Sequence, residues 1–518
     1  MTSGRTPSEW TSSERDLVIA VDHGSGGAKV GLVTLTGEIL WSWAERRDAV
    51  HSSTEQDAER WWTTITRAVR DGLEATAARE RVIAVAVTGQ WSSTVPVDAE
   101  GRPVGPCLMW NDTQGIGHSR ERFAGPALGY APRNALTWLR RSGGIPSPSG
   151  ADPVSHMLHL DRDRPELHDR LRWYLEPVDY LTMRFTGIAA ATVLSMFPSW
   201  LIDNRVPGAA GYDPVLVARA GINPARLPPL VPAESVIGTV RADVAGELGI
   251  PLTTAVVPGL PDIHNAAIAS GALGSYETHL GLGTSSWVSC PVPSKVSSVR
   301  WQMASVPGIG EAGYQLINGQ DNGGRALDWF HQAIAPDLDH RALLALAAAA
   351  PAGSGGVLFT PWLTGEHSPI DDRAARGGFH NVSLDTGRGE LARAVMEGVG
   401  LNTRWLLTGV ERVIRHRVDS VRVLGGAARH DLWCQILADT TSRTVHRVAD
   451  PTMAGVRGAA LWAGLCLHTV SRTELARLVP IDAVFTPDPA NRAIHERMFA
   501  EFPGLYSGAK GMFRRLNG

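Results

Sequence analysis

Lysine is nearly missing from this chain of 518 residues: only Lys29, Lys295 and Lys510 stand among its 49 basic residues, and the rest are arginine. The skew is typical of a coding bias and by itself indicates no partner. The formal net charge of -3 excludes a general polyanion binder, because nucleic-acid-binding proteins usually carry a clustered basic surplus. We therefore expect no nucleic-acid partner.

Cysteine is also rare, and the four present (Cys107, Cys290, Cys434 and Cys466) form no C-x-x-C pair. This argues against a disulfide framework and a zinc site, and it is typical of a reducing compartment. No apolar run reaches the ~18 residues that a membrane span needs. Residues 1–15 are polar and lack the apolar core of a signal peptide. We expect a cytoplasmic protein with a disordered N-terminus over residues 1–15 and no membrane partner.

The order of patterns along the chain predicts two domains, within the range that about 150 residues per domain allows. Residues 17–40 contain two β-branched apolar runs around a glycine-rich turn, and residues 57–77 show the apolar spacing of an amphipathic helix. Residues 82–87 form a short apolar run typical of a buried parallel strand. Because similar patterns recur at 278–290 and 421–429, the sequence predicts two similar α/β domains.

Three glycine-rich turns could bind phosphate groups. The first, D-H-G-S-G-G-A-K at residues 22–29, follows a strand, and the backbone N–H groups of such turns can point at phosphate oxygens. Asp22 could hold Mg²⁺ directly or through water, because this ion prefers hard oxygen ligands. The turn is neither a Walker A loop nor a G-x-G-x-x-G loop, and an ordinary tight turn is the alternative.

The second turn places Thr284 after Gly283, and a hydroxyl beside glycines suits a second phosphate clamp, with a hairpin turn as the alternative. The third turn, which contains Gly425 and Gly426, closes a buried strand. Its small residues would let a flat base or a phosphate approach the backbone. Close packing of a helix on the strand explains this third turn equally well.

Asp262 stands where a strand gives way to a turn, within P-G-L-P-D-I-H-N. An acid at such a position could be a general base for a hydroxyl proton. Taken alone, an Asx turn or a helix N-cap is the more common reading, and the nearby His264 is expected to be structural. Together, the two glycine loops in similar halves, the third glycine turn and this acid predict a nucleotide in an interdomain cleft.

In this order the motifs resemble those of the FGGY carbohydrate kinases, within the superfamily of actin, Hsp70 and sugar kinases. The hairpin at 22–29 matches the D-x-G-[TS] opening of that family. Five further segments resemble family motifs: T-G-Q at 88–90, L-M-W-N-D at 108–112, P-W-L-T-G-E-H-S-P at 361–369, L-G-G-A-A-R at 424–429 and G-V-R-G-A-A at 455–460.

The resemblance implies two similar ribonuclease H-like (actin-like ATPase) domains with an interdomain cleft. On this basis we expect an N-terminal, sugar-binding domain over residues 16–256 and a C-terminal, nucleotide-binding domain over 257–490. A C-terminal helical tail is expected over 491–518. Its aromatic residues suit packing on the rest of the chain or on a second copy in a homodimer, and the sequence leaves both open.

The resemblance also implies ATP-dependent phosphorylation of a sugar or polyol hydroxyl. ATP and Mg²⁺ are the expected cofactors, with Asp262 as the catalytic base and Asp22 and Asp262 as the metal ligands. The residues expected to bind ATP are Asp22, Gly24, Ser25, Lys29, Gly283, Thr284, Gly324, Asp328, Gly425 and Gly426. Those expected to bind the sugar are Gln90, Trp91, Asn111, Asp112 and Asp262.

A ketopentose similar to D-xylulose is the expected substrate, because Gln90 and residues 110–112 are similar to the xylulokinase pattern. Two departures concern the sugar site. Trp91 and Ser92 follow where xylulokinases have Met-His and glycerol kinases Arg-Glu, and Ile263 follows the base where Asn or Gln is usual. The alternatives are a kinase of another sugar or polyol (ribulose, glycerol or erythritol type) and a non-catalytic nucleotide- or sugar-binding regulator on the same fold.

Overall fold

The computed structural model describes residues 16–24, 26–45, 54–126, 129–147, 149–205, 207–208, 211–298, 300–309 and 313–518. The expected disorder of residues 1–15 and the expected phosphate ligand Ser25 lie outside these described residues. Contacts divide the chain into two compact units. Unit 1 comprises Met1–Gly271, Val306–Gly308 and Gly455–Leu478, and unit 2 comprises Ala272–Ser305, Ile309–Ala454 and Val479–Gly518. The domain limits inferred from the sequence stay a prediction.

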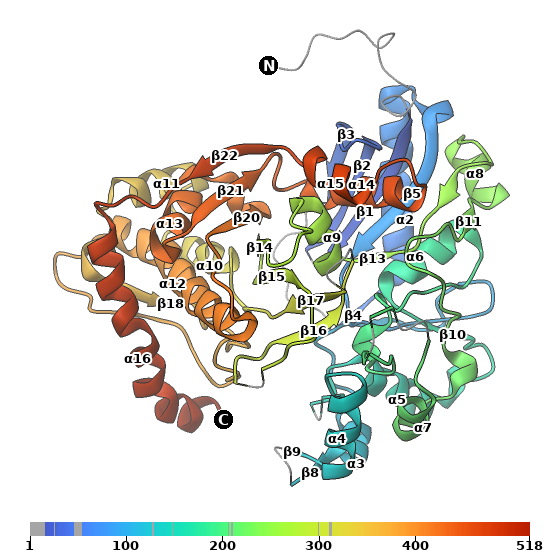
Figure 1. Cartoon of the computed structure of the whole chain (residues 1–518), viewed down its shortest axis with the longest axis horizontal. Helices are drawn as coiled ribbons and strands as arrows, with labels where there is room; N and C mark the ends of the chain where they lie inside the picture. The colour runs from blue at the N-terminus through green and yellow to red at the C-terminus, as the bar shows by residue number, and fades with distance from the viewer. Residues whose placement is uncertain are drawn as a thin grey trace. The chain divides into compact units, whose positions relative to one another are not determined.

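Unit 1 is built on a mixed sheet in the order β11-β12-β5-β1-β2-β3, with β13 also paired to β5 (Figure 1). Its strands are β1 (Leu17–Gly24), β2 (Gly27–Thr34), β3 (Ile39–Ala44), β5 (Val82–Gly89), β11 (Gly238–Thr239), β12 (Ala255–Val256) and β13 (Leu260–Pro261). β1 and β2 form an antiparallel hairpin. β5 pairs in parallel with three strands: β1, β12 and β13. The apolar run L-V-I-A-V of β1 is buried throughout, as is typical of a strand covered on both faces.

Helix α2 (Ala58–Thr76) packs on β2 and β3. It begins after Asp57, whose side chain accepts a hydrogen bond from the N–H of Glu59 at 2.9 Å. Trp61, Ile65 and Val69 follow at intervals of four and are buried, so one face of the helix covers the sheet. The helix predicted over 57–77 is confirmed.

The remaining elements of unit 1 surround this layer. The strands are β4 (Glu55–Gln56), β6 (Val95–Val97), β7 (Cys107–Leu108), β8 (Ala124–Gly125), β9 (Gly129–Tyr130) and β10 (Trp173–Leu175). The helices are α3 (Ile116–Phe123), α4 (Pro132–Arg141), α5 (Pro153–Asp163), α6 (Pro177–Thr186), α7 (Pro214–Ala220), α8 (Ala242–Leu248), α9 (Asp262–Ser270), α14 (Ala454–Cys466) and α15 (Arg472–Leu478). α14 lies beside the hairpin although it is far away in sequence, and a Cβ at Gly31 would lie 2.4 Å from Val456 Cγ1 (Figure 1).

Unit 2 repeats the arrangement of unit 1. Its sheet has the order β16-β17-β15-β14-β20-β21-β22. The strands are β14 (Thr278–Leu282), β15 (Ser286–Val292), β16 (Ala304–Pro307), β17 (Tyr314–Ile317), β20 (Ser420–Leu424), β21 (Thr444–Val448) and β22 (Ile481–Phe485), and β18 (Leu358–Thr360) pairs separately with β19 (Gly378–His380). β14 forms an antiparallel hairpin with β15 and runs parallel to β20, as β1 does with β2 and β5. The prediction of two similar α/β domains is confirmed.

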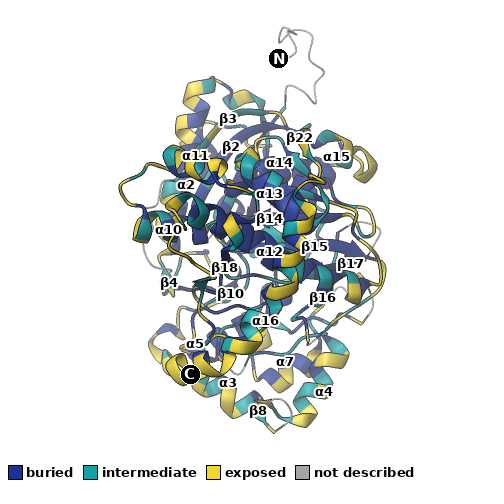
Figure 2. Cartoon of the chain, turned by 90° about the vertical axis from the view of Figure 1, so that its left-hand side faces the viewer, coloured by how far each residue is buried: buried dark blue, intermediate teal, exposed yellow. Residues whose placement is uncertain are grey.

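The helices of unit 2 are α10 (Arg325–Ile334), α11 (His340–Ala349), α12 (Arg388–Ile414), α13 (Asp431–Thr441) and α16 (Arg492–Asn517). The tail helix α16 packs on its own unit: Phe502 is fully buried, and its ring lies edge-on to Trp362 at 5.9 Å. The hydroxyl of Tyr506 donates to Asp372 Oδ2 at 2.8 Å. Figure 2 shows exposed residues in yellow near the C-terminal end of this helix. The aromatic residues of the tail therefore contact the same chain.

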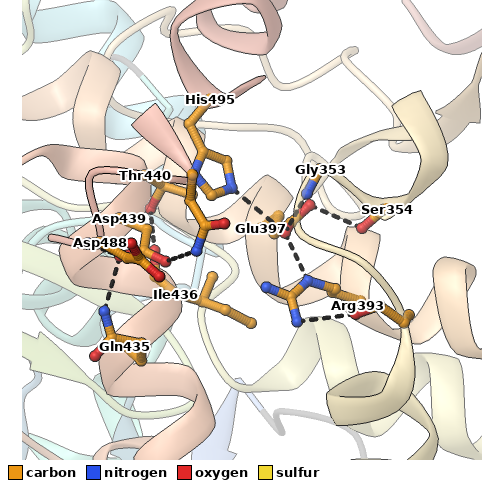
Figure 3. A network of polar contacts seen from close by, with 12 residues as sticks. Gly353, Ser354, Arg393, Glu397, Gln435, Ile436, Asp439, Thr440, Asp488 and His495 are labelled. Atoms are coloured by element: carbon orange, nitrogen blue, oxygen red, sulfur yellow. Dashed lines mark hydrogen bonds and ion pairs between the residues drawn. The ribbon is translucent and has the colours of Figure 1, made fainter. Parts of the chain in front are cut away.

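A buried ionic network ties α16 to α12 (Figure 3). Glu397 of α12 is fully buried and accepts hydrogen bonds from the N–H of Gly353 at 2.9 Å, from Ser354 Oγ at 2.7 Å and from Arg393 Nε at 2.8 Å. His495 of α16 lies at 3.4 Å from the same carboxylate. Burial alone would raise the pKa of Glu397, but the hydrogen bond from His495 and the charge of Arg393 outweigh it and lower the pKa.

In the part of the chain that the structure describes, no helix combines the length and the apolar character that crossing a bilayer requires. The four cysteines are buried as free thiols.

We predict that Phe502→Ala lowers the thermal unfolding midpoint, because removing this ring leaves a cavity against Trp362. Phenylalanine-to-alanine changes in a core cost about 3–5 kcal/mol. Met512→Ala on the same helix is the matched control, since Met512 is 45% exposed. Scanning calorimetry of both variants checks the prediction, and equal shifts in the two midpoints would contradict the packing of α16 described above.

Candidate active site

The end of the β1–β2 hairpin carries two side chains of opposite charge. Antiparallel pairing sets Asp22 directly opposite Lys29, so the two side chains lie on one face of the sheet. Lys29 Nζ is 3.3 Å from Asp22 Oδ2, and the side chains are 33% and 13% exposed, respectively. Gly27, which begins β2, has a φ of 126°, a backbone conformation that favours glycine. A partly buried ion pair therefore lies beside the turn, near the end of β1.

The start of α14 closes over Asp22. A Cβ at Gly455 would lie 2.3 Å from Asp22 Oδ2, so only glycine fits there. The carbonyl oxygen of Gly455 accepts a hydrogen bond from Asn265 Nδ2 of α9 at 2.8 Å. At Gly458 a Cβ would lie 2.6 Å from Asn265 Oδ1. Two glycines one helical turn apart thus allow α14 to approach both the acid and α9.

Asp262 follows β13, a short strand that pairs in parallel with β5. β13 pairs with β5 so that Pro261 lies opposite Gly89, which places Asp262 and Gln90 just beyond the carboxyl ends of adjacent strands. Asp262 is half-buried and is the first residue of α9. Burial, together with the nearby charge of Asp22, raises the pKa of Asp262 to about 7. The structure therefore brings the expected base and the expected metal ligand of unit 1 together.

The expected sugar ligands at 90 and 91 lie beside this pair. Gln90 is 3% exposed, and neither atom of its side-chain amide has a hydrogen-bond partner among the residues that the structure describes. The indole N–H of Trp91 donates to the carbonyl oxygen of Ser195 at 2.8 Å, and its ring lies edge-on to His264 at 5.4 Å. His264 Nε2 is itself 2.8 Å from the carbonyl oxygen of Pro307. Trp91 is thus held in one orientation, while Gln90 offers an unused donor and acceptor.

Asp112 is engaged locally. Its carboxylate accepts hydrogen bonds from the backbone N–H and from Nε2 of Gln114, both at 2.9 Å. The side chain is buried, whereas the neighbouring Asn111 is half-buried. Asn111 is therefore more accessible to a ligand than Asp112.

Two buried acids near this site were missed from the sequence. Glu176, the N-cap of α6, accepts from the N–H of Ser93 at 3.2 Å through Oε2, and within the described part of the chain its Oε1 has no hydrogen-bond partner. Burial and the charges of Asp179 and Asp262 raise the pKa of Glu176 well above its ordinary value. Burial does the same for Asp179. The one local signal was a pair of acids in L-E-P-V-D-Y-L, inside an otherwise apolar stretch.

In unit 2 three glycine turns converge. The N–H of Gly324 donates to the carbonyl oxygen of Gly283 at 2.7 Å, and the N–H of Gly323 donates to that of Thr284 at 2.9 Å. Gly425 has a φ of 108°, and a Cβ there would lie 2.5 Å from the carbonyl oxygen of Leu282. We name residues 283–284, 323–324 and 425–426 the glycine clamp. Thr284 and Gly426 are exposed, and so is Asp328 in the first turn of α10.

Each unit therefore opens its mixed sheet with a strand, a glycine turn and a strand, and unit 1 adds two acids at strand ends. This arrangement defines a class, the proteins with an actin-like ATPase fold. The chain matches the N-terminal domain of the FGGY family of carbohydrate kinases over residues 17–269 and the C-terminal domain over 280–467. It belongs to the FGGY family of carbohydrate kinases and is an ATP-dependent sugar kinase.

Known proteins resemble the chain over almost its whole length. The xylulose kinase of Staphylococcus epidermidis is 26% identical over 514 residues, which cover 96% of this chain and 97% of that protein. The solved xylulose kinase from Lactobacillus acidophilus has a TM-score of 0.83 at 20% identity and covers 97% of this chain and 100% of its own. The gluconate kinase from the same species also has a TM-score of 0.83 at 20% identity, with 97% and 99% covered. These structures confirm the predicted fold.

We predict that Gly455→Ala displaces the Asp22 carboxylate and lowers ATP turnover about 10- to 100-fold, since small misplacements of reacting groups are costly. Gly246→Ala is the matched control, because this helical glycine of unit 1 has nothing within 4 Å of an added Cβ. Steady-state ADP release, measured beside a thermal melt, compares the two variants. Equal turnover in both would contradict the close approach of α14 to Asp22.

Proposed function

We propose that this sugar kinase transfers the γ-phosphoryl group of ATP to a hydroxyl of a ketopentose similar to D-xylulose, with Asp262 as the general base. The observation that carries this proposal is the half-buried Asp262 beside Asp22 and the unpartnered amide of Gln90. A carboxylate whose pKa lies near 7 can accept a hydroxyl proton at neutral pH without being fully protonated beforehand.

In this mechanism the chain mainly positions the reactants and accepts one proton. Asp262 accepts the proton of the attacking hydroxyl as that oxygen bonds to the γ-phosphorus, and ADP leaves. Gln90, Trp91 and Asn111 orient the sugar. Lys29 adds a positive charge near the end of the hairpin, where phosphate oxygens would otherwise face Asp22.

The residues of unit 1 fit a magnesium ion. Asp22 and Asp262 carry oxygen ligands, and their mutual repulsion contributes to the raised pKa of Asp262, so a divalent cation would stabilise the pair. No group of three or more His, Cys, Asp or Glu that could hold a metal occurs among the described residues. Water and phosphate oxygens commonly supply the other ligands of Mg²⁺. The ion would supply positive charge to the transferred phosphoryl group.

The glycine clamp is the proposed nucleotide site of unit 2. At Gly324 and Gly425 the absence of a side chain lets the turns of the clamp pack closely on one another. An added Cβ would meet nothing within 4 Å at Gly426 and only the carbonyl oxygen of Ser285, at 3.8 Å, at Gly283, so phosphates or a flat base can approach the backbone there. The exposed hydroxyl of Thr284 can donate to a phosphate oxygen, and the exposed Asp328 and Gly426 lie where the nucleoside is expected.

Two observations support a neutral substrate. The first is the xylulose kinase relatives, such as that of Staphylococcus epidermidis. The second is charge: no arginine or lysine of the described chain forms an ion pair with Asp262, Glu176 or Asp179. An anionic sugar acid would meet unbalanced repulsion there, whereas neutral hydroxyl groups can donate to these oxygens.

We expect Asp262→Asn to lower kcat by about 10²–10⁴, the range typical of removing a general base, because the amide cannot take up the proton. Asp243→Asn is the control, since Asp243 is an exposed acid of α8 in the same unit. Sugar-dependent ADP release measures both variants. Unchanged turnover in Asp262→Asn would refute the assignment of the base.

The pH profile tests the electrostatics of the acid pair. Asp262 acts as a base only when ionised, so kcat/KM is expected to fall about tenfold per pH unit below pH 7. Asp22→Asn removes a charge that raises this pKa, so the acid limb is expected to move to lower pH even if the plateau is reduced. An acid limb in the same place in both proteins would show that Asp22 does not control the titration.

A substrate panel tests the sugar. ADP release is measured with D-xylulose, D-ribulose, glycerol, erythritol and gluconate. D-Xylulose is expected to give the highest kcat/KM, and gluconate a value lower by about 100-fold or more, since like charges left unpaired cost several kcal/mol. Highest activity on gluconate would contradict the proposed substrate class. Activity on none of the five, with ATP binding intact, would favour a regulator.

A further inference from the structure

A fully buried acid, Glu366, lies behind the glycine clamp of unit 2. Its Oε1 accepts hydrogen bonds from the backbone N–H groups of Asp321 at 2.9 Å and His367 at 3.0 Å. Its Oε2 accepts from Asn402 Nδ2 of α12 at 2.7 Å. Asn402 Oδ1 in turn accepts from the indole N–H of Trp362 at 3.3 Å. One carboxylate therefore joins α12, the 362–367 segment and the loop that contains Asp321.

That loop leads directly into the clamp. Asp321 lies two residues before Gly323 and three before Gly324, whose N–H groups donate to the carbonyl oxygens of Thr284 and Gly283. Just before it, Gln320 exchanges two backbone hydrogen bonds with Ser286, at 3.0 and 2.7 Å. A shift of the loop would therefore move two of the three turns of the clamp, those at 283–284 and 323–324.

The segment around Glu366 holds the loop at two further points. Asn322 Nδ2 donates to Thr364 Oγ1 at 3.2 Å, and the N–H of Ser368 donates to the carbonyl oxygen of Gly319 at 2.9 Å. With Asp321 bonded to Glu366, residues 364–368 contact the loop from Gly319 to Asn322 at successive positions. The loop is thus fixed along its length.

The tail helix supports this segment from behind. Glu366 and Asp372 exchange backbone hydrogen bonds at 3.1 and 2.9 Å, and Tyr506 of α16 donates to the Asp372 carboxylate. Phe502 of α16 packs against Trp362, the side chain that ends the hydrogen-bond chain from Glu366. The contacts therefore run without a break from α16 through Glu366 to the clamp.

We propose that Glu366 is a positioning residue for ATP, which fixes the loop 319–324 and thereby the geometry of the glycine clamp. The inference rests on the proposed nucleotide site at that clamp. A carboxylate suits the role because its two oxygens accept three N–H groups at once, and removal of it would leave buried donors unpaired.

The first test compares Glu366→Ala with Glu366→Gln. The alanine variant is expected to raise the KM for ATP about tenfold or more, with the KM for the sugar within about twofold, because unpaired donors release the loop. The glutamine variant is expected to stay within about threefold of the parent. Its Oε1 can accept both backbone N–H groups, and only the hydrogen bond from Asn402 Nδ2 is lost, because the glutamine Nε2 is itself a donor. Burial, with the nearby charge of Asp321, raises the pKa of Glu366 to about 8, so a neutral side chain is a close substitute.

Glu397→Ala is the matched control. Glu397 is an equally buried acid of unit 2 that accepts hydrogen bonds from the 353–354 turn and from Arg393 and lies 3.4 Å from His495 of α16 (Figure 3). These partners lie outside the loop 319–324, so Glu397 does not contact that loop directly. It is expected to lower the melting temperature while leaving the KM for ATP within about twofold. Equal increases in the KM for ATP in Glu366→Ala and Glu397→Ala would show a general loss of stability and overturn the proposal.

A milder variant covers the case in which Glu366→Ala does not fold. Asn402→Ala removes one donor to Glu366 and keeps the carboxylate, and it is expected to raise the KM for ATP about threefold. An unchanged KM for ATP in Asn402→Ala, or in a folded Glu366→Ala, would also overturn the proposal.

Thr284→Val separates this inference from the site on which it rests. If Thr284→Val leaves the KM for ATP unchanged, the clamp is not the nucleotide site and the proposed function of unit 2 fails. If Thr284→Val raises it about tenfold and Glu366→Ala does not, the clamp stands and only the role of Glu366 is refuted.

Discussion

The site in unit 1 depends on the partial burial of two carboxylates, Asp22 and Asp262, at the ends of β1 and β13, which both pair with β5. Such a pair is unfavourable by itself, since both desolvation and like charge oppose ionisation. Its surroundings offset this cost: Lys29 pairs with Asp22, and Asp262 stays partly protonated near neutral pH. The same constraint fixes Gly455, because no other residue can lie against the Asp22 carboxylate. The position of the Asp22 carboxylate therefore constrains both the charge balance of the site and the packing of α14.

Much of this architecture could be predicted because patterns within short segments of the sequence determine it. The hairpin over 17–40 and the helix over 57–77 follow from the spacing of apolar residues and glycines, and the structure reproduces them as β1, β2 and α2. The ordered motifs also predicted the carbohydrate kinase family, which the family matches confirm. Local patterns were sufficient wherever the determining contacts are local.

The rest could not be predicted because it depends on contacts between distant segments. No residue near Glu176 in the sequence indicates that Asp262 lies close to it in space. The charge of Asp262 nevertheless contributes to the raised pKa of Glu176. Likewise the packing of α14 on Asp22 joins residues more than 400 positions apart, and only the glycine at 455 hinted at a close approach. Glu366 was visible within a family motif, but two of its three donors, Asp321 and Asn402, come from distant parts of unit 2.

The scarcity of lysine makes Lys29 informative. In a chain that uses arginine almost everywhere else, position 29 lies on the hairpin 3.3 Å from Asp22, where a compact ammonium can pair with a carboxylate while the side chain stays 33% exposed. A guanidinium would spread its charge over a planar fork and favour a two-point contact with the carboxylate. Such a contact would hold Asp22 more tightly and leave less of the positive charge for phosphate oxygens. The ammonium instead keeps donors available on its exposed side, which favours a role for Lys29 in binding phosphate rather than in simply neutralising Asp22.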